Sequence, residues 1–133
     1  MLELAENQVD EASRFAYFLI RAQVLAGLKR EADAIAALET AKGSSKDTPA
    51  ERVEYIKADS LVHYFLGNDV LSLEKALLGA TAAEEANLPY QHAVMLHNAG
   101  DGYLSLGDHT KARETLVRSR ELTTRHEIGR AHV

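Results

Sequence analysis

The chain has 133 residues, of which 46% are hydrophobic, 26% charged and 6% aromatic, and its formal net charge is −5. This length fits one domain with its own core, and the negative charge argues against a nucleic-acid-binding protein, which usually carries a basic face. The sequence contains no cysteine for disulfides or thiolate zinc sites, no apolar run long enough to cross a bilayer, and no start that resembles a signal peptide.

The predicted secondary structure is helical throughout, because Ala, Leu, Glu, Lys and Arg are abundant and no segment alternates as a strand does. Apolar residues at helical spacing predict a first helix over about 10–28 and a second over 31–42. Gly43 stands where a C-terminal glycine cap belongs, and a polar loop follows it.

The third helix, which should run to Leu66, begins with the capping-box pattern Thr48-Pro49-Ala50-Glu51. We expect the Thr48 hydroxyl to accept a hydrogen bond from the Glu51 amide. The Glu51 carboxylate should in turn reach back to the amide of the cap residue. This pattern therefore predicts a sharp helix start after the polar loop.

Three further helices follow, separated by short breaks that contain Gly, Asn, Asp or Pro. The fourth should end near Ala86, the fifth should cover 90–106, and the sixth should run from His109 to about Arg125, with Asp108 as its N-cap. Six helices separated in this way suggest three successive helical hairpins.

The last of these hairpins has the clearest pattern. Leu96, Gly100 and Tyr103 lie on one face of its first helix. Ala112, Leu116 and Ser119 lie on one face of its second helix. Small residues beside large ones let two helices approach closely and interlock.

This hairpin resembles a tetratricopeptide repeat (TPR), whose pattern is a bulky residue, a small one, Tyr, a Gly-Asp turn and an Ala in the second helix. The matching positions are Leu96, Gly100, Tyr103, Gly107-Asp108 and Ala112. The first hairpin matches through Phe18, Ala22, Leu25, Ala34, Leu38 and Ala41, with its turn glycine displaced to Gly27. The middle hairpin keeps Ile56, Ser60 and Leu66-Gly67-Asn68, and its second helix fits more than one register.

The small positions Ala22, Ser60 and Gly100 lie 38 and 40 residues apart, whereas the usual repeat has ~34 residues. The chain therefore resembles the longer repeats of bacterial regulators, such as MalT-like regions. This resemblance implies an all-α fold of tandem helix-turn-helix repeats that stack into a right-handed α-solenoid. About three TPR-like hairpins are expected, near 10–43, 48–87 and 89–126.

Both ends of the sequence suggest a fragment of a longer protein. Residues 1–7 resemble the tail of a helix from a preceding repeat, so the repeat domain is expected over 8–126. Residues 127–133 have no helical periodicity, and back-translation of Ile128 to Val133 can give a string that resembles a widely used sequencing adapter. We expect this last segment to be disordered or non-native.

The resemblance implies a protein- or peptide-binding scaffold that uses the concave face of the repeats, as part of a larger cytoplasmic bacterial signalling regulator. No nucleic acid, membrane or cofactor is expected as a partner. Carried over position by position, the partner-binding residues are Leu19, Gln23, Lys57, Leu61, Tyr64, Val94, His97, Asn98, Asp101, Leu104 and Ser105. The alternative is an accessory sensor segment of a multidomain signalling enzyme, such as a kinase, a cyclase or a nucleotide-driven transcription regulator.

Catalysis by this chain itself is not expected. The sequence contains no Gly-rich phosphate loop, no HExxH motif and no nucleophile elbow. His97 and Asp101, four residues apart, share a helix face and would supply two metal ligands, whereas a structural zinc site needs about four. A hydrogen-bonded pair on the binding face is the better interpretation.

Overall fold

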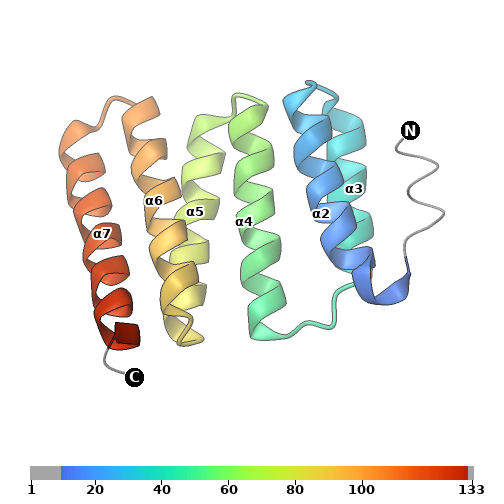
Figure 1. Cartoon of the computed structure of the whole chain (residues 1–133). Coiled ribbons are helices and arrows are strands. Elements are labelled where there is room, and N and C mark those ends of the chain that lie inside the picture. Colours follow the sequence, from blue (N-terminus) through green and yellow to red (C-terminus); the bar gives the residue numbers. More distant parts are fainter. Residues whose placement is uncertain (1–9, 132–133) are drawn as a thin grey trace.

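The computed structural model describes residues 10–131, and this part of the chain is all-helical (Figure 1). Neighbouring helices run antiparallel, side by side in a row. The all-α class is thereby confirmed, and five of the six helices begin and end close to their predicted positions. The helices are α2 (Glu11–Gly27), α3 (Glu31–Gly43), α4 (Pro49–Phe65), α5 (Asp69–Glu85), α6 (Pro89–Ser105) and α7 (His109–Ala131).

Four of the five connections are the same three-residue turn, at 28–30, 66–68, 86–88 and 106–108. The third residue of each turn donates its amide hydrogen to a carbonyl five residues earlier, over 2.8–2.9 Å, and the middle residue donates to a carbonyl three residues earlier. This pair of backbone hydrogen bonds is the Schellman motif, in which the middle residue of the turn is left-handed. The left-handed residues are Lys29, Gly67, Asn87 and Gly107, with φ of 62°, 82°, 56° and 81°.

Two predictions about glycine are wrong. Gly27 is the last residue of α2, and the left-handed position of the first hairpin is held by Lys29 instead. The Lys29 ammonium also donates to the carbonyl of Phe65, at the end of α4. Gly43 ends α3 without a left-handed cap, since Ser44 follows it in right-handed helical conformation. The chain therefore leaves α3 by a different route from the other helices.

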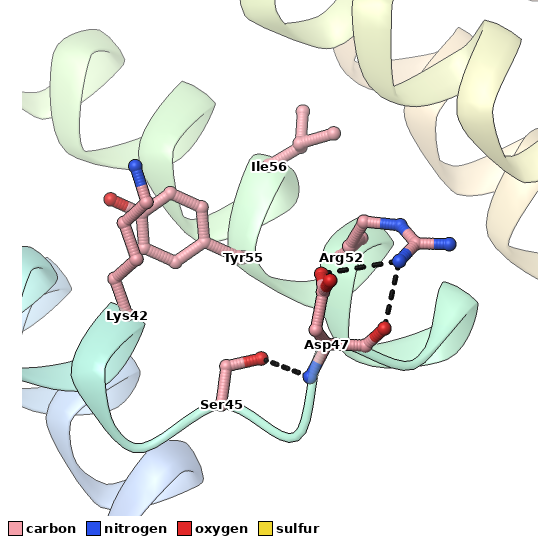
Figure 2. Close-up of a pocket in the computed structure, with 6 residues that line it drawn as sticks. All are labelled: Lys42, Ser45, Asp47, Arg52, Tyr55 and Ile56. Carbon is pink, nitrogen blue, oxygen red and sulfur yellow. Dashed lines mark hydrogen bonds and ion pairs between the residues drawn. The ribbon is translucent and has the colours of Figure 1, made fainter.

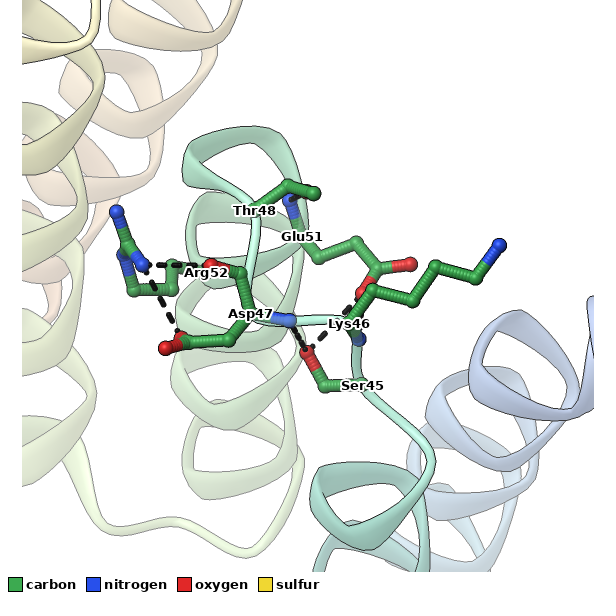
Figure 3. Close-up of polar contacts among 6 residues, drawn as sticks. All are labelled: Ser45, Lys46, Asp47, Thr48, Glu51 and Arg52. Carbon is green, nitrogen blue, oxygen red and sulfur yellow. Dashed lines mark hydrogen bonds and ion pairs between the residues drawn. The ribbon is translucent and has the colours of Figure 1, made fainter.

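The connection between α3 and α4 is longer and more polar than the others. It spans 44–48, and α3 has 13 residues where α2, α4, α5 and α6 each have 17. The Thr48 hydroxyl accepts from the Glu51 amide at 3.1 Å, as predicted. The Glu51 carboxylate does not reach back to Thr48: it accepts from the Lys46 amide at 2.5 Å and the Ser45 hydroxyl at 3.0 Å (Figure 3).

Asp47, in the same linker, is held in a left-handed conformation with φ of 55°. Such a conformation costs a non-glycine residue about 1–2 kcal/mol. The Arg52 guanidinium donates to the Asp47 carbonyl at 2.7 Å and to its carboxylate at 3.1 Å (Figure 3). The first turn of α4 therefore fixes the linker that leads into it.

Equivalent positions in the three hairpins can be assigned from the turns, because Ala22, Ser60 and Gly100 each lie seven residues before a left-handed residue. Each is followed twelve positions later by a small buried residue: Ala34, Ser72 and Ala112. In the middle hairpin the Ser60 and Ser72 hydroxyls each donate to the other residue's carbonyl at 2.9 Å. These bonds place Ser72 opposite Ser60, which resolves the register left open for that hairpin.

The last hairpin packs on the faces that its sequence predicts. A Cβ built on Gly100 would lie 2.5 Å from Leu116 Cγ, so only glycine allows this approach of α6 to α7. The Ser119 hydroxyl donates to the Ala93 carbonyl at 2.6 Å, and the Lys111 ammonium lies 5.9 Å from the centre of the Tyr103 ring. These contacts close the hairpin along most of its described length.

The core is divided along the row. One cluster joins α2, α3 and α4 around Phe18, Leu25, Leu38 and Val62. A second cluster joins α5 and α6 around Leu73 and Met95. The middle hairpin therefore contributes α4 to one cluster and α5 to the other.

The predicted C-terminal boundary differs from the structure. The backbone of α7 is helical up to Ala131, so the helix end expected near Arg125 is wrong. The segment assigned to a preceding repeat, 1–7, lies outside the described residues, as do 132 and 133. Within 10–131, no helix combines the length and apolar character needed to cross a membrane.

Candidate functional site

The first helices of the three hairpins, α2, α4 and α6, lie on one side of the row, with α3 and α5 behind them (Figure 1). All eleven predicted partner-binding residues belong to these three helices. Their accessibility differs, however, and the structure brings only some of them together. We call the side lined by α2, α4 and α6 the front face.

Leu19 is a correction to the predicted site. Only 6% of its surface is exposed, and it belongs to the cluster of α2, α3 and α4. The equivalent positions in the other hairpins hold polar residues, Lys57 and His97. A leucine at this position is buried in the core instead, so Leu19 is not available to a partner.

Gln23 and Lys57 are half-buried and bonded within their own helices. The Gln23 amide donates to the Leu19 carbonyl at 3.3 Å. The Lys57 ammonium lies 3.2 Å from the Glu54 carboxylate. A partner would have to replace these contacts in order to use either group.

Four predicted residues from two hairpins surround one small pocket between α4 and α6. Leu61 and Tyr64 come from α4, and Asn98 and Asp101 come from α6. The serine pair Ser60 and Ser72 completes the lining, and the pocket volume is about 100 Å³. Residues 37 positions apart, such as Tyr64 and Asp101, are thus neighbours on the front face.

The polar groups of this pocket are only partly satisfied. Asp101 lies 3.5 Å from His97 Nε2, a contact that is an ion pair only when the imidazole is protonated. Asn98 is half-buried, and its side-chain amide forms no hydrogen bond with any described residue. The Tyr64 ring is 46% exposed and packs edge-on against Phe65. The pocket therefore offers a carboxylate, an amide and an aromatic ring.

The remaining predicted residues lie outside the pocket lining. Leu104 is 45% exposed, Ser105 is exposed, and Val94 is half-buried on α6. They extend the front face of α6 above and below the pocket. Their role in binding stays a prediction.

A second, larger pocket was not predicted. It lies at the junction of α3 and α4, has a volume of about 450 Å³, and is lined by Lys42, Ser45, Asp47, Arg52, Tyr55 and Ile56 (Figure 2). It opens where α3 stops one turn short of the other helices. The only sequence signal for it was the shorter spacing, 38 residues, between Ala22 and Ser60.

The chemistry of this second pocket is mixed. Burial, followed by the negative charges of Asp59 and Glu39, raises the pKa of the Tyr55 hydroxyl above its usual value of 10.0. The Arg52 guanidinium is already paired with Asp47 at 3.1 Å. Opposite charges that are paired within the wall do not select one sign of ligand charge, so this pocket is a weaker candidate than the one between α4 and α6.

In the part of the chain that the structure describes, no group of three or more His, Cys, Asp or Glu side chains is placed to hold a metal ion. The His97–Asp101 pair supplies two potential ligands.

The described residues thus define an all-α protein with a small mixed-polarity pocket lined by α4, α5 and α6. A scan against protein-family models, a search of curated proteins and a search of solved structures each gave no match.

Proposed function

We propose that this chain is a TPR-like protein-binding module whose front face takes an extended peptide segment of a partner. The pocket between α4 and α6 carries this proposal, because it joins the accessible side chains of Leu61 and Tyr64 to the carboxylate of Asp101 and the unbonded amide of Asn98. Peptide segments are recognised by this combination: polar groups bond the backbone, and apolar pockets take alternate side chains.

Three further observations support a repeat module. The three hairpins share equivalent small residues at the helix crossings, two of the inter-helix turns within hairpins use glycine, and all three place the left-handed residue at the same position. Equivalent residues in successive hairpins give a row of similar surfaces, as in stacked helical repeats. The proposal includes a solenoid arrangement of these repeats within a larger bacterial regulator, in line with the resemblance in the sequence.

The test is to select, from a displayed peptide library, peptides that bind the full chain, and then to measure their affinity for variants of the chain. Tyr64→Ala and Leu104→Ala, at 46% and 45% exposed positions of the front face, should together weaken a selected peptide about tenfold or more. Leu78→Ala is the matched control, because Leu78 is 54% exposed on α5. Peptides that lose affinity only with the control variant would contradict the proposal.

A further inference from the structure

The pocket between α4 and α6 is lined by acceptors and an aromatic ring, and none of its lining residues is a cation. Its walls are Ser60, Leu61, Tyr64, Ser72, Asn98 and Asp101. The two serine hydroxyls already donate their hydrogens to each other's carbonyls at 2.9 Å. Their oxygens can therefore act towards a ligand only as acceptors.

Asp101 brings a negative charge to this pocket, and among the described residues its ion-pair partner is His97. The contact with His97, at 3.5 Å, is charged only when the imidazole is protonated. Lys57 of α4 and Lys75 of α5 are paired with acids of their own: Lys57 with Glu54 at 3.2 Å and Lys75 with Asp59 at 3.1 Å. A cation that enters the pocket would therefore meet an available carboxylate.

Asn98 is not explained by the packing of the hairpins. The equivalent position in α4 holds Ala58, which is 1% exposed and packs into the core, and in α2 it holds Ile20. Ile20 is 62% exposed, so this position belongs to the core only in α4. Asn98 carries an amide without a hydrogen-bond partner in the described chain. Its carbonyl oxygen can supply an acceptor beside Asp101.

Tyr64 adds an aromatic ring to the pocket lining. Ring faces attract cations, and the attraction adds to that of a nearby carboxylate. A primary ammonium has three donors on a compact head, whereas a guanidinium is a wide planar fork. A pocket of about 100 Å³ matches the smaller group.

We infer that this pocket binds the ammonium group of a lysine side chain presented by the partner. Asp101 supplies the negative charge, and Asn98 and the serine oxygens supply hydrogen-bond acceptors. Leu61 contacts the methylenes of the lysine side chain, and the Tyr64 ring contacts its ammonium group. This inference rests on the proposed function, since it names a residue type that the bound segment contains.

The test uses the full chain and two small probes, Nα-acetyl-lysine methylamide and Nα-acetyl-norleucine methylamide, which differ by the ammonium group. Binding is followed by NMR shifts of assigned backbone amides. The lysine probe should produce saturable shifts at Tyr64, Asn98 and Asp101, and the norleucine probe should produce none there. Equal shifts with both probes would overturn the ammonium site.

Variants sharpen the result. Asp101→Asn keeps the side-chain shape, removes the charge, and should weaken the lysine probe about tenfold. Tyr64→Leu should weaken it a few-fold, in line with the loss of a cation–π contact. Glu74→Gln, at an exposed acid on α5, is the matched control and should leave binding unchanged. Full affinity in Asp101→Asn would overturn the inference.

Failure of this inference is distinguishable from failure of the proposed function. Selected peptides that bind the front face without lysine, and that bind Asp101→Asn as tightly, would remove the ammonium site and leave the binding module intact. A library that yields no front-face peptide would count against the module, while the two small probes would still decide whether the pocket takes an ammonium.

Discussion

The junction between α5 and α6 is closed and apolar, whereas the junction between α3 and α4 is open and polar. At the first, a three-residue turn joins two helices of 17 residues, and a Cβ built on Gly79 would lie 2.6 Å from Met95 Cε. At the second, Tyr55 takes the position equivalent to Met95, stays half-buried, and lines a pocket of about 450 Å³. The same kind of junction is thus formed by side-chain packing in one case and by a hydrogen-bonded linker in the other.

The difference shows what a single missing turn changes. Because α3 ends one turn early, a hydrogen-bonded polar linker leads into the start of α4. Hydrogen bonds in an exposed linker contribute less to stability than a closed apolar contact does. We therefore expect the α3–α4 junction to open more readily than the α5–α6 junction.

The largest effect should come from truncation at the two equivalent positions. Met95→Ala leaves a cavity in a fully buried site and should lower the free energy of unfolding by about 2–5 kcal/mol. Tyr55→Ala removes a half-buried ring beside an open pocket and should cost about 1 kcal/mol. Denaturant unfolding measures both. Equal losses would show that the two junctions are packed alike.

The next effect tests close helix approach directly. Gly100→Leu should lower the free energy of unfolding by about 1–3 kcal/mol, because the new side chain overlaps Leu116. Gly27→Leu is the matched control, since no atom lies within 4 Å of a Cβ built there. It should leave stability unchanged or raise it slightly. A flat response to Gly100→Leu in thermal unfolding would contradict the α6–α7 packing.

A smaller effect is expected in the polar linker. Glu51→Ala removes the acceptor for the Lys46 amide and the Ser45 hydroxyl, and should cost about 1 kcal/mol. Trypsin cleavage after Lys46 should accelerate. Asp108→Ala removes a comparable side-chain bond, to the Lys111 amide at 3.1 Å, and is the control. If both variants speed cleavage at Lys46 equally, the linker network does not hold this junction.

The smallest effect concerns alkaline pH. Because the pKa of Tyr55 is raised, the folded protein keeps the phenol proton above pH 10.0 while the unfolded chain loses it. Stability from this group is therefore complete below pH 10.0 and declines as pH rises through the folded-state pKa. Tyr55→Phe should reduce this decline, and Tyr90→Phe, at an exposed residue, should not. Denaturant unfolding between pH 9 and 11 compares them.

Much of the fold was predictable from the residues that start and end helices. Pro49, Gly67 and Gly107 mark helix ends or starts as predicted, because each has a backbone requirement that few other residues meet. Lys29 was missed for the same reason, since a lysine in a left-handed turn carries no sequence signal. The spacings of 38 and 40 residues have a structural cause: α3 is four residues shorter than α5, and its linker is two residues longer.

The candidate site was predictable only in part. Tyr64 and Asp101 were assigned to the binding face separately, and the structure shows that they share a pocket. Leu19 was misplaced, because position within a repeat defines a direction but a leucine there can turn into the core. The pocket beside Tyr55 was missed, since it arises from a length difference between helices rather than from a motif.

The repeated three-residue turn has a practical consequence for engineering. One hydrogen-bond pattern is shared by the turns at 28–30, 66–68, 86–88 and 106–108. We therefore expect the sequence of one turn to be able to replace that of another. Grafting Leu106-Gly107-Asp108 onto 28–30 should keep the helices in phase, relieve the left-handed lysine and remove its bond to Phe65. The 44–48 linker follows a different hydrogen-bond pattern, so it cannot be exchanged in this way.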